Sequence, residues 1–393
     1  MGVWRALMYT PAIVAIGYDR PEALKRLLTS IESADYPEGA SPVLVISIDN
    51  SGKGDVVDVA NGFEYSHGRK VVIARQERMG LREHVLACGD LTDEYGSIIV
   101  LEDDIFVSPN YYGYACAALD RSDSDDRIGS ISLYDHRFNV HVRESFTAID
   151  DGYDNYYLQI ASSWGQAYTK KQWDAFRSWY DVNKDRDLKG PLVPENISGW
   201  SDRSWLKYYI VYLIEKGKYC IYPRVSLTTN FGDVGTHAKS ADADLQVPIA
   251  GRGKKNTYSF STIDESRSVY DPFFESVRIS IPEAGSEDVL VDLYGIKPVG
   301  ELIRKNGYRY VLSSSAYPYK VIRGYGRQMR PVDANIVYGI SGNDMWLYDT
   351  TEPGQRPAGA PKAHRLLYEY RGISAARMIE MIKYRIAEKF GRK

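Results

Sequence analysis

Apolar residues in the first hundred positions alternate between short continuous runs and helical spacing. Continuous runs occupy residues 12–18, 43–49 and 70–76, and a fourth, Ser97–Leu101, leads into three acidic residues. Such runs are typical of strands buried on both faces. The segments between them place apolar residues every three or four positions, as amphipathic helices do. Repeated strand–helix units predict an α/β fold, a mostly parallel sheet with helices on both faces.

Local sequence signals predict where several helices begin. Pro21 opens a helix after the first strand, and Ser108 with Pro109 is expected to cap another. Thr169 and Gln172 have the spacing of a capping box, in which each side chain bonds the other residue's backbone.

The middle of the chain predicts further strands and one long apolar helix. Residues 129–135, 157–168 and 219–230 are each expected to form one strand. The helix is expected to start near Ser201, with Asp202 in its first turn, and to stop at Gly217.

The pattern changes after about residue 285, and the chain is expected to divide there. Residues 1–285 are expected to form one domain, with a nucleotide-binding half (1–125) and an acceptor and sugar half (126–285). The expected C-terminal elements are a small α/β appendage at 286–351, a Pro/Gly linker at 352–361 and a basic amphipathic helix at 362–393.

Three adjacent carboxylates end the fourth strand. Glu102, Asp103 and Asp104 stand between apolar residues on both sides, so they do not belong to a loose polar loop. Neighbouring negative charges repel unless a cation compensates them. Carboxylate oxygens suit Mg²⁺ or Mn²⁺, which take few protein ligands and complete their shell with phosphates. The alternative is an ordinary solvated turn at a strand end.

Other polar residues follow neighbouring strands. Arg20 comes after the first strand, and Asp49 ends the second. Ligands of such sheets bind beyond the carboxyl ends of the strands, so these residues and the three acids are expected at one site. Neither a dinucleotide-binding GxGxxG turn nor a P-loop occurs.

Composition narrows the class of protein. The 393 residues have a net charge of −3, which argues against general nucleic-acid binding. Cys88, Cys116 and Cys220 form no CxxC pair, which fits a reducing compartment. No apolar run approaches the roughly 20 residues of a membrane span, and the first residues lack a signal-peptide core. The expected location is the cytoplasm, with a possible peripheral position on the inner face of the membrane.

Several motifs occur in the order found in one enzyme family. They are "DRP" at 19–21, "LREHVLA" at 81–87, "VLEDDIFVSPNYYGY" at 100–114, "ASSWGQAYTKKQW" at 161–173, "WSDRSW" at 200–205 and "YPRVSLTTNFGDVGTHA" at 222–238. Together they resemble nucleotide-sugar glycosyltransferases of GT-A fold, above all the alpha-mannoside beta-1,2-N-acetylglucosaminyltransferase I family. The resemblance covers about residues 10–240. The chain departs from the eukaryotic family in lacking its membrane anchor, so a bacterial, unanchored relative is the nearer analogy.

The resemblance implies a metal and a diphosphate near the acids. Asp104 would bind Mn²⁺ or Mg²⁺, and His237 would close over the diphosphate or the metal. Asp103 would reach the ribose or the waters of the metal, and Glu102 would orient these ligands.

The same resemblance implies residues for the rest of the UDP-sugar. Arg20 and Asp49 would hold the nucleotide base and its neighbouring groups, and His84 would stack on or hydrogen-bond the uracil. The alternative for His84 is a core histidine on an apolar helix face. Trp164 and Gly165 would line the sugar pocket.

The implied reaction is metal-dependent transfer from a UDP-sugar to a glycan or lipid-linked glycan, in surface polysaccharide or glycolipid synthesis. Asp202 would take the proton of the acceptor hydroxyl, and a single base implies inversion. Its alternative is an acid placed only for the helix dipole. Two other functions stay open: a sugar nucleotidyltransferase, although "GYDRPE" at 17–22 lacks the Gly-rich loop it needs, and a non-catalytic glycan-binding protein.

The last 23 residues, 371–393, are basic and amphipathic. They hold seven basic and two acidic residues, a net charge of +5. One apolar stripe consists of Ala375, Ile379, Ile382, Ile386 and Phe390. The stripe is expected either to dock on the protein's own core or on a second subunit, as in a homodimer, or to lie on an anionic membrane surface.

Overall fold

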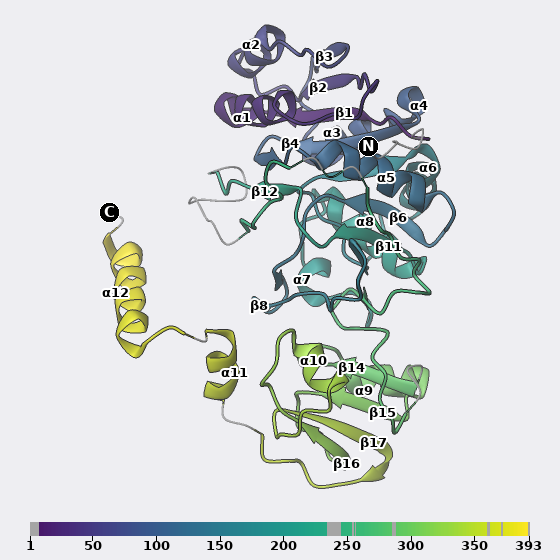
Figure 1. The fold of residues 1–393 in the computed structure, drawn as a ribbon, viewed down its shortest axis with the longest axis vertical. Helices are drawn as coiled ribbons and strands as arrows, with labels where there is room; N and C mark the ends of the chain where they lie inside the picture. The colour runs from purple at the N-terminus through teal and green to yellow at the C-terminus, as the bar shows by residue number, and fades with distance from the viewer. Residues whose placement is uncertain are drawn as a thin grey trace.

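The computed structural model contains a large sheet, a smaller sheet and two C-terminal helices (Figure 1). It describes residues 8–233, 245–253, 255, 257–284, 288–359, 362–370 and 372–391.

The large sheet has nine strands, most of them paired in parallel. Its order is β13-β9-β11-β6-β10-β4-β1-β2-β3. The strands are β1 (Ala12–Gly17), β2 (Leu44–Ile48), β3 (Lys70–Ala74), β4 (Ser97–Glu102), β6 (Ile128–Ser132), β9 (Asn155–Leu158), β10 (Gln166–Thr169), β11 (Tyr219–Pro223) and β13 (Val269–Tyr270). Strand β10 lies antiparallel between β4 and β6, so β4 and β6 run in the same direction.

Alternate residues of the strands face helices on opposite sides. Ile13 and Leu101 pack with α1 (Pro21–Glu32), α2 (Asp55–Gly62) and α5 (Tyr111–Ser122). Val14 and Val100 belong to a second core with α3 (Leu81–Gly89), α6 (Lys170–Asn183) and α8 (Trp205–Glu215). Two short helices, α4 (Thr92–Tyr95) and α7 (Glu195–Ser198), lie between these elements. The predicted fold class is confirmed.

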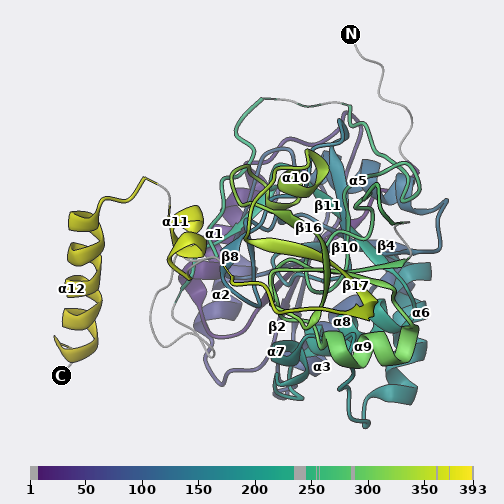
Figure 2. The same ribbon diagram turned by 90° about the horizontal axis from the view of Figure 1, so that it is seen from below.

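A four-stranded sheet in the order β14-β15-β17-β16 follows the large sheet. Its elements are β14 (Val289–Asp292), α9 (Val299–Asn306), β15 (Tyr310–Ser313), β16 (Tyr319–Tyr325), α10 (Val332–Val337) and β17 (Met345–Pro353). Figure 1 shows it below the main body, so that it lies in front of that body in Figure 2, which is seen from below. One of its faces continues the core of the main body, because Leu293 and Leu312 belong to the same apolar cluster as Tyr270 and Phe274. These elements lie in the segment for which an α/β appendage was expected, and the expected domain bounds stay a prediction.

Two short strand pairs complete the sheets. Strand β5 (Ile105–Val107) pairs with β12 (Thr228–Asn230), and β7 (Phe138–Asn139) pairs with β8 (Glu144–Ser145).

Two helices begin later than the sequence predicts. Helix α5 begins at Tyr111 after Asn110, without a side-chain cap from Ser108. Helix α8 begins at Trp205, because the Ser204 hydroxyl, and not that of Ser201, accepts the N–H three residues ahead. Asp202 consequently lies in the turn before the helix, outside its first turn. The capping box at the start of α6 is confirmed.

Three segments that the sequence predicts as single elements each form two separate elements in the structure. The 157–168 segment contains the end of β9 and the start of β10, with Gly165 at a φ of 97° before the second strand. The 219–230 segment forms β11 and then β12. The expected helix at 362–393 divides into α11 (Lys362–Glu369) and α12 (Ala375–Gly391), because Gly372 adopts a φ of 93°. No helix of the described residues is both long and apolar enough to cross a membrane.

Candidate active site at the carboxyl edge of the sheet

The register of the parallel strands brings the predicted polar residues to one edge. Ile16 of β1 pairs with Glu102 at the end of β4, and Gly17 pairs with Ile48 of β2. Arg20, Asp49 and the three acids therefore follow adjacent strand ends, as expected for a ligand site of such a sheet. Because β10 is antiparallel, residues just before it also lie at this edge.

Asp103 is held by Arg20. The Arg20 Nε donates to Asp103 Oδ2 at 3.3 Å, and Nη2 forms an ion pair with the other carboxylate oxygen. Asp103 is 5% exposed, and burial raises its pKa to about 6 although Arg20 opposes the rise. The ion pair fixes Asp103 and places a cation beside its neighbour Asp104, whose Oδ2 lies 3.8 Å from Arg20 Nη2.

Asp104 has one carboxylate oxygen without a partner. Its backbone oxygen accepts the N–H of Phe231 at 2.9 Å, and its side chain is hydrogen-bonded by Asn230. Oδ1 is buried and has no hydrogen-bond partner among the described residues. Burial raises the pKa of this carboxyl. An unpaired buried carboxylate oxygen is costly, and a bound cation would remove that cost.

Glu102 connects the acids to α8. The Trp205 side chain, at the first position of α8, hydrogen-bonds Glu102. Burial, with the charges of Asp104 and Asp103, raises the pKa of Glu102 to about 8. Burial therefore favours the neutral form of Glu102 in the metal-free protein. The link joins the start of α8, three residues after Asp202, to the acid cluster.

The carboxylate of Asp202 is exposed and ion-paired. Its Oδ1 lies 2.9 Å from Nζ of Lys207, which also donates to the Trp200 oxygen at 2.9 Å. Arg82 donates to the Asp202 backbone oxygen at 2.8 Å. The Lys207 hydrogen bond lowers the pKa of Asp202, so the carboxylate is ionised at neutral pH. The lysine, and not a position inside the helix, lowers this pKa.

Asp49 and His84 lie inside the fold. The Asp49 carboxylate accepts the N–H groups of Met79 at 2.8 Å and Gly80 at 2.9 Å, and so fixes the loop before α3. His84 is 2% exposed, and its Nε2 bonds the Ser47 hydroxyl at 2.8 Å. Burial lowers the pKa of His84 to about 4, so the ring is neutral. These contacts are those of a core histidine; nucleotide binding by either residue stays a prediction.

Trp164 and Gly165 lie against β12. The half-buried Trp164 ring is 4.7 Å from that of Tyr134, and the Trp164 oxygen accepts the Thr228 hydroxyl at 2.6 Å. Gly165 has a φ of 97°, and a Cβ there would lie 3.0 Å from Thr228 Cγ2. This position therefore favours glycine on both counts. His237 lies outside the described residues.

The structure adds an acid that sequence analysis missed. Asp135 follows β6, is 4% exposed and accepts the Tyr156 hydroxyl at 3.1 Å. Arg137 lies 2.8 Å from its other oxygen, and burial raises its pKa to about 7. The rule that located Asp49, an acid at the end of an apolar strand, also applies to Asp135. No sequence pattern of this kind marks the other residues that contact the predicted acids, which are Asn230, Trp205 and Lys207.

The residues fit a metal held by few protein ligands. No group of three or more His, Cys, Asp or Glu side chains in the described part of the chain has metal-binding geometry. Asp104 nevertheless has one unsatisfied oxygen at the sheet edge. This suits Mg²⁺ or Mn²⁺, which bind through one or two carboxylates and complete their shell with substrate phosphates.

Comparison with known proteins gives distant structural likeness only. No protein-family model and no curated protein matches the sequence. The mannosyltransferase PcManGT from Pyrobaculum calidifontis, solved with GDP-Man and Mn²⁺, aligns with a TM-score of 0.34 and 14% identity, covering 55% of this chain and 55% of that chain. TarS 1-349 of S. aureus, solved with UDP-GlcNAc, aligns with a TM-score of 0.37 and 13% identity, covering 59% of this chain and 61% of that chain.

The chain spans less than two thirds of the length of each of these proteins. A likeness at this level assigns no donor, acceptor or reaction to the chain. Membership of the N-acetylglucosaminyltransferase family stays a prediction from the motifs.

Proposed function

We propose that this chain is a glycosyltransferase that moves a sugar from a UDP-sugar to the hydroxyl of a glycan or lipid-linked glycan, with the help of Mn²⁺ or Mg²⁺. The supporting observation is the buried Asp104 Oδ1, which has no described partner at the carboxyl edge of the sheet. A site that compensates this carboxylate with a cation suits a ligand that carries phosphates. A diphosphate-linked sugar is such a ligand.

Asp104 would hold the metal, and the Arg20–Asp103 ion pair would keep that carboxylate in place. When bound, the ion would neutralise the charge that develops on the leaving diphosphate. The chain's own residues would position the rest of the donor. Asp49, through the loop that it fixes, would act on the base side, and Trp164 with Gly165 on the sugar side.

Asp202 would act as the general base. The acceptor oxygen forms a bond to the anomeric carbon while the bond from that carbon to the diphosphate oxygen breaks, and the acceptor proton goes to Asp202. Ionisation at neutral pH is a requirement for this role; an exposed aspartate meets it, and the Lys207 hydrogen bond lowers the pKa of Asp202 further. One displacement inverts the anomeric configuration. The transferred sugar would be a hexose or an N-acetylhexosamine, in surface polysaccharide or glycolipid synthesis.

The test is UDP release from a panel of UDP-sugars, with Mn²⁺ and with EDTA. We expect release with at least one donor, lost in EDTA and in Asp104→Asn without loss of thermal stability. Asp126→Asn is the control, because this exposed carboxylate precedes β6 at the opposite edge of the sheet.

Three results would overturn the proposal. Metal-independent turnover in Asp104→Asn would remove the metal role. Pyrophosphate release from UTP with a sugar 1-phosphate would show a nucleotidyltransferase. Glycan binding without any turnover would show a non-catalytic module.

A further inference from the structure

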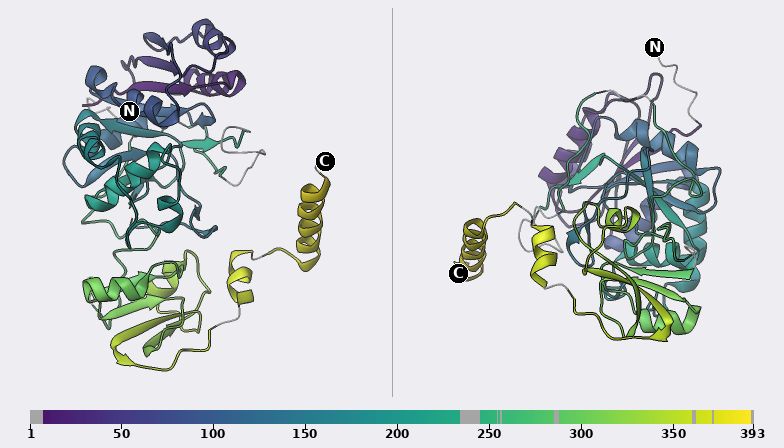
Figure 3. Two further views of the ribbon diagram at one scale, coloured as in Figure 1. Left: turned by 180° about the vertical axis from the view of Figure 1, so that it is seen from behind. Right: turned by 60° about the horizontal axis from the view of Figure 1, so that its bottom comes forward.

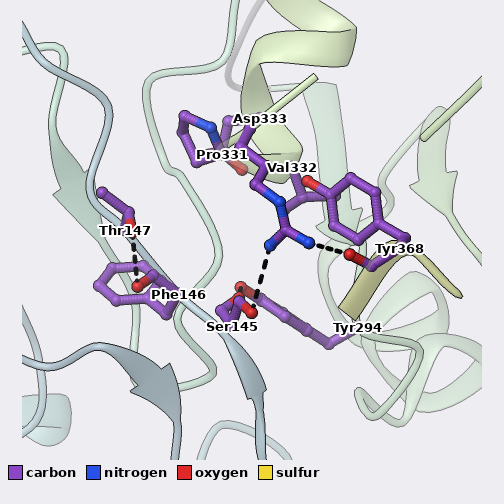
Figure 4. Close-up of a pocket in the computed structure, with 9 residues that line it drawn as sticks. Ser145, Phe146, Thr147, Tyr294, Pro331, Val332, Asp333 and Tyr368 are labelled. Carbon is purple, nitrogen blue, oxygen red and sulfur yellow. Dashed lines mark hydrogen bonds between the residues drawn. The ribbon is translucent and has the colours of Figure 1, made fainter. Parts of the chain in front are cut away.

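The C-terminal helices differ in how they contact the protein. Helix α11 is fixed at the junction of the main body and the appendage. Its Tyr368 hydroxyl donates to the Met329 oxygen at 2.7 Å, and its Glu369 accepts the Ser145 hydroxyl at 2.6 Å. Figure 4 shows Ser145 and Tyr368 at this junction. The guanidinium of Arg330 donates to the Ser145 hydroxyl at 3.4 Å and to the Tyr368 backbone oxygen.

Helix α12 stands away from the body. Figure 1 and both views of Figure 3 show it separate from the rest of the chain, on the side from which β12 projects. Side chains 375–387 are exposed, except Met378, which is half-buried. Ile379, Ile382 and Ile386 are each more than half exposed. Docking on the protein's own core would bury the apolar stripe of α12. In the structure these side chains of the stripe are exposed instead.

The face of α12 is apolar in the middle and basic at its margins. With about 100° between successive residues, Ala375, Ile379, Ile382 and Ile386 fall within roughly 60° of one another. Lys383 and Arg385 lie about 70° and 90° to either side of this stripe, on the same scale. Glu380 is about 130° away, and Arg377 and Tyr384 lie opposite the stripe. The cations therefore flank the apolar residues on both sides.

This arrangement fits an anionic lipid surface better than a second copy of the helix. A stripe with cations at both margins lets the isoleucines enter the interface while Lys383 and Arg385 reach lipid phosphates. Two copies packed stripe to stripe would bring their marginal cations together along the seams. Leu366 and Leu367 of α11, and Tyr370 directly after it, are also exposed.

We infer that α12 is a peripheral docking helix for an anionic membrane surface, held to the body by α11. The inference goes beyond the proposed function, since it does not require sugar transfer. It places the membrane on the side of the molecule where β12 and the end of β4 lie. A lipid-linked acceptor would then meet the sheet edge at the same surface.

The test is flotation of the full chain with vesicles of phosphatidylcholine containing about 30% phosphatidylglycerol, and with pure phosphatidylcholine vesicles. We expect binding to the anionic vesicles only, reduced by high salt. The triple variant Ile379→Ser/Ile382→Ser/Ile386→Ser and the double variant Lys383→Glu/Arg385→Glu should each lower partitioning at least tenfold. Tyr384→Ser, on the opposite face, is the matched control and should bind as the unchanged protein does.

Equal binding by all variants would overturn the inference, as would the absence of binding by the full chain. If the full chain is a dimer that the triple serine variant converts to a monomer, the face joins copies of the chain and the membrane role is wrong. The unfolding temperature of each variant is measured as a control. A value equal to that of the unchanged protein shows that the fold is intact. Asp104→Asn should lose UDP release and still bind the anionic vesicles as the unchanged protein does. The failure of one proposal can therefore be told from the failure of the other.

Discussion

Three neighbouring acids have three different environments at the scale of single residues. Asp103 is paired with Arg20, Asp104 keeps one oxygen without a partner, and Glu102 is hydrogen-bonded by Trp205. Since identical charges lie side by side, burial and partners decide which of them stays ionised. The sequence showed the triplet but not this division of roles.

Replacing Asp202 tests the proposed base. Asp202→Asn should cut turnover roughly 100-fold and leave UDP-sugar binding nearly unchanged, because only the proton acceptor is lost. Single-turnover kinetics with calorimetric donor binding measure the two effects separately. Unchanged turnover with weaker donor binding would make Asp202 a binding residue.

Lys207 should set the acid limit of the reaction. It lowers the pKa of Asp202, so the acid limb of kcat/KM lies below the ordinary range of an aspartate. In Lys207→Met this pKa rises, and the limb moves to higher pH. Lys216→Met, at the other end of α8, should leave the profile in place. An unmoved limb in Lys207→Met would show that Asp202 does not titrate in the reaction.

Glu102 should make the stability of the metal-free protein fall as pH rises. Its pKa is about 8 when folded and 4.5 in its ordinary state, so the folded protein holds a proton that the unfolded chain releases between these values. The stability is complete below pH 4.5 and declines as pH rises through 8. Glu102→Gln, a permanent mimic of the neutral acid, should raise Tm in EDTA at pH 9 by roughly 2 °C or more and have little effect at pH 5. An equal shift at both pH values would contradict the burial of a neutral acid.

The start of α8 is the decisive feature at the scale of elements. The Ser204 cap, the Trp205–Glu102 hydrogen bond and the Lys207–Asp202 ion pair fall within six residues. The turn that presents Asp202 is therefore positioned by the helix and by the acid cluster together. A substitution that destabilises the start of α8 should therefore make the position of the Asp202 carboxylate less fixed, although the carboxylate itself is still present.

The Ser204 cap provides a graded test. Ser204→Ala should lower stability by about 1 kcal/mol, the usual effect of a lost cap, and reduce turnover more than donor affinity. Ser204→Thr keeps a hydroxyl acceptor and should restore both values. Full activity in the alanine variant would show that the turn holds its position without the cap.

Sequence patterns located the ends of helices and strands well where residues close in sequence determine them. They were less successful where contacts between distant segments determine them. Pro21 opens α1, and the Thr169–Gln172 box opens α6, since both signals act within one turn. The break before β10 depends on the close approach of Gly165 to Thr228, which is distant in sequence. The partners of Asp103 and Asp104 likewise come from other segments, and no periodicity predicts them.

The appendage and the main body share one core at the scale of the whole molecule. Lys297 is ion-paired with Asp271, and Glu275 accepts the N–H of Tyr294 at 2.9 Å. These bonds cross the junction between the two sheets. Because a continuous apolar cluster also crosses it, we expect the two parts to unfold together.

Removing Lys297 tests this coupling. Lys297→Met leaves the carboxylate of Asp271 without its buried partner and should cost about 3 kcal/mol. Lys305→Met, on the exposed side of α9, is the control and should be nearly neutral. Calorimetry should show one transition, lowered in Lys297→Met only. Two separate transitions in the unchanged protein would contradict a shared core.

The pairing of β5 with β12 also determines when the acid cluster is completed during synthesis. Asn230 pairs with Ile105 across 125 positions of the chain, and the strand β10 beside β4 is made in between. A growing chain can form the parallel strands β1 to β4 early, since their contacts are near in sequence. Asp104 then lacks its contacts with Asn230 and Phe231 until residue 231 has left the ribosome. The ribosome-bound intermediate thus has the charges of the site before it has the wall that organises them.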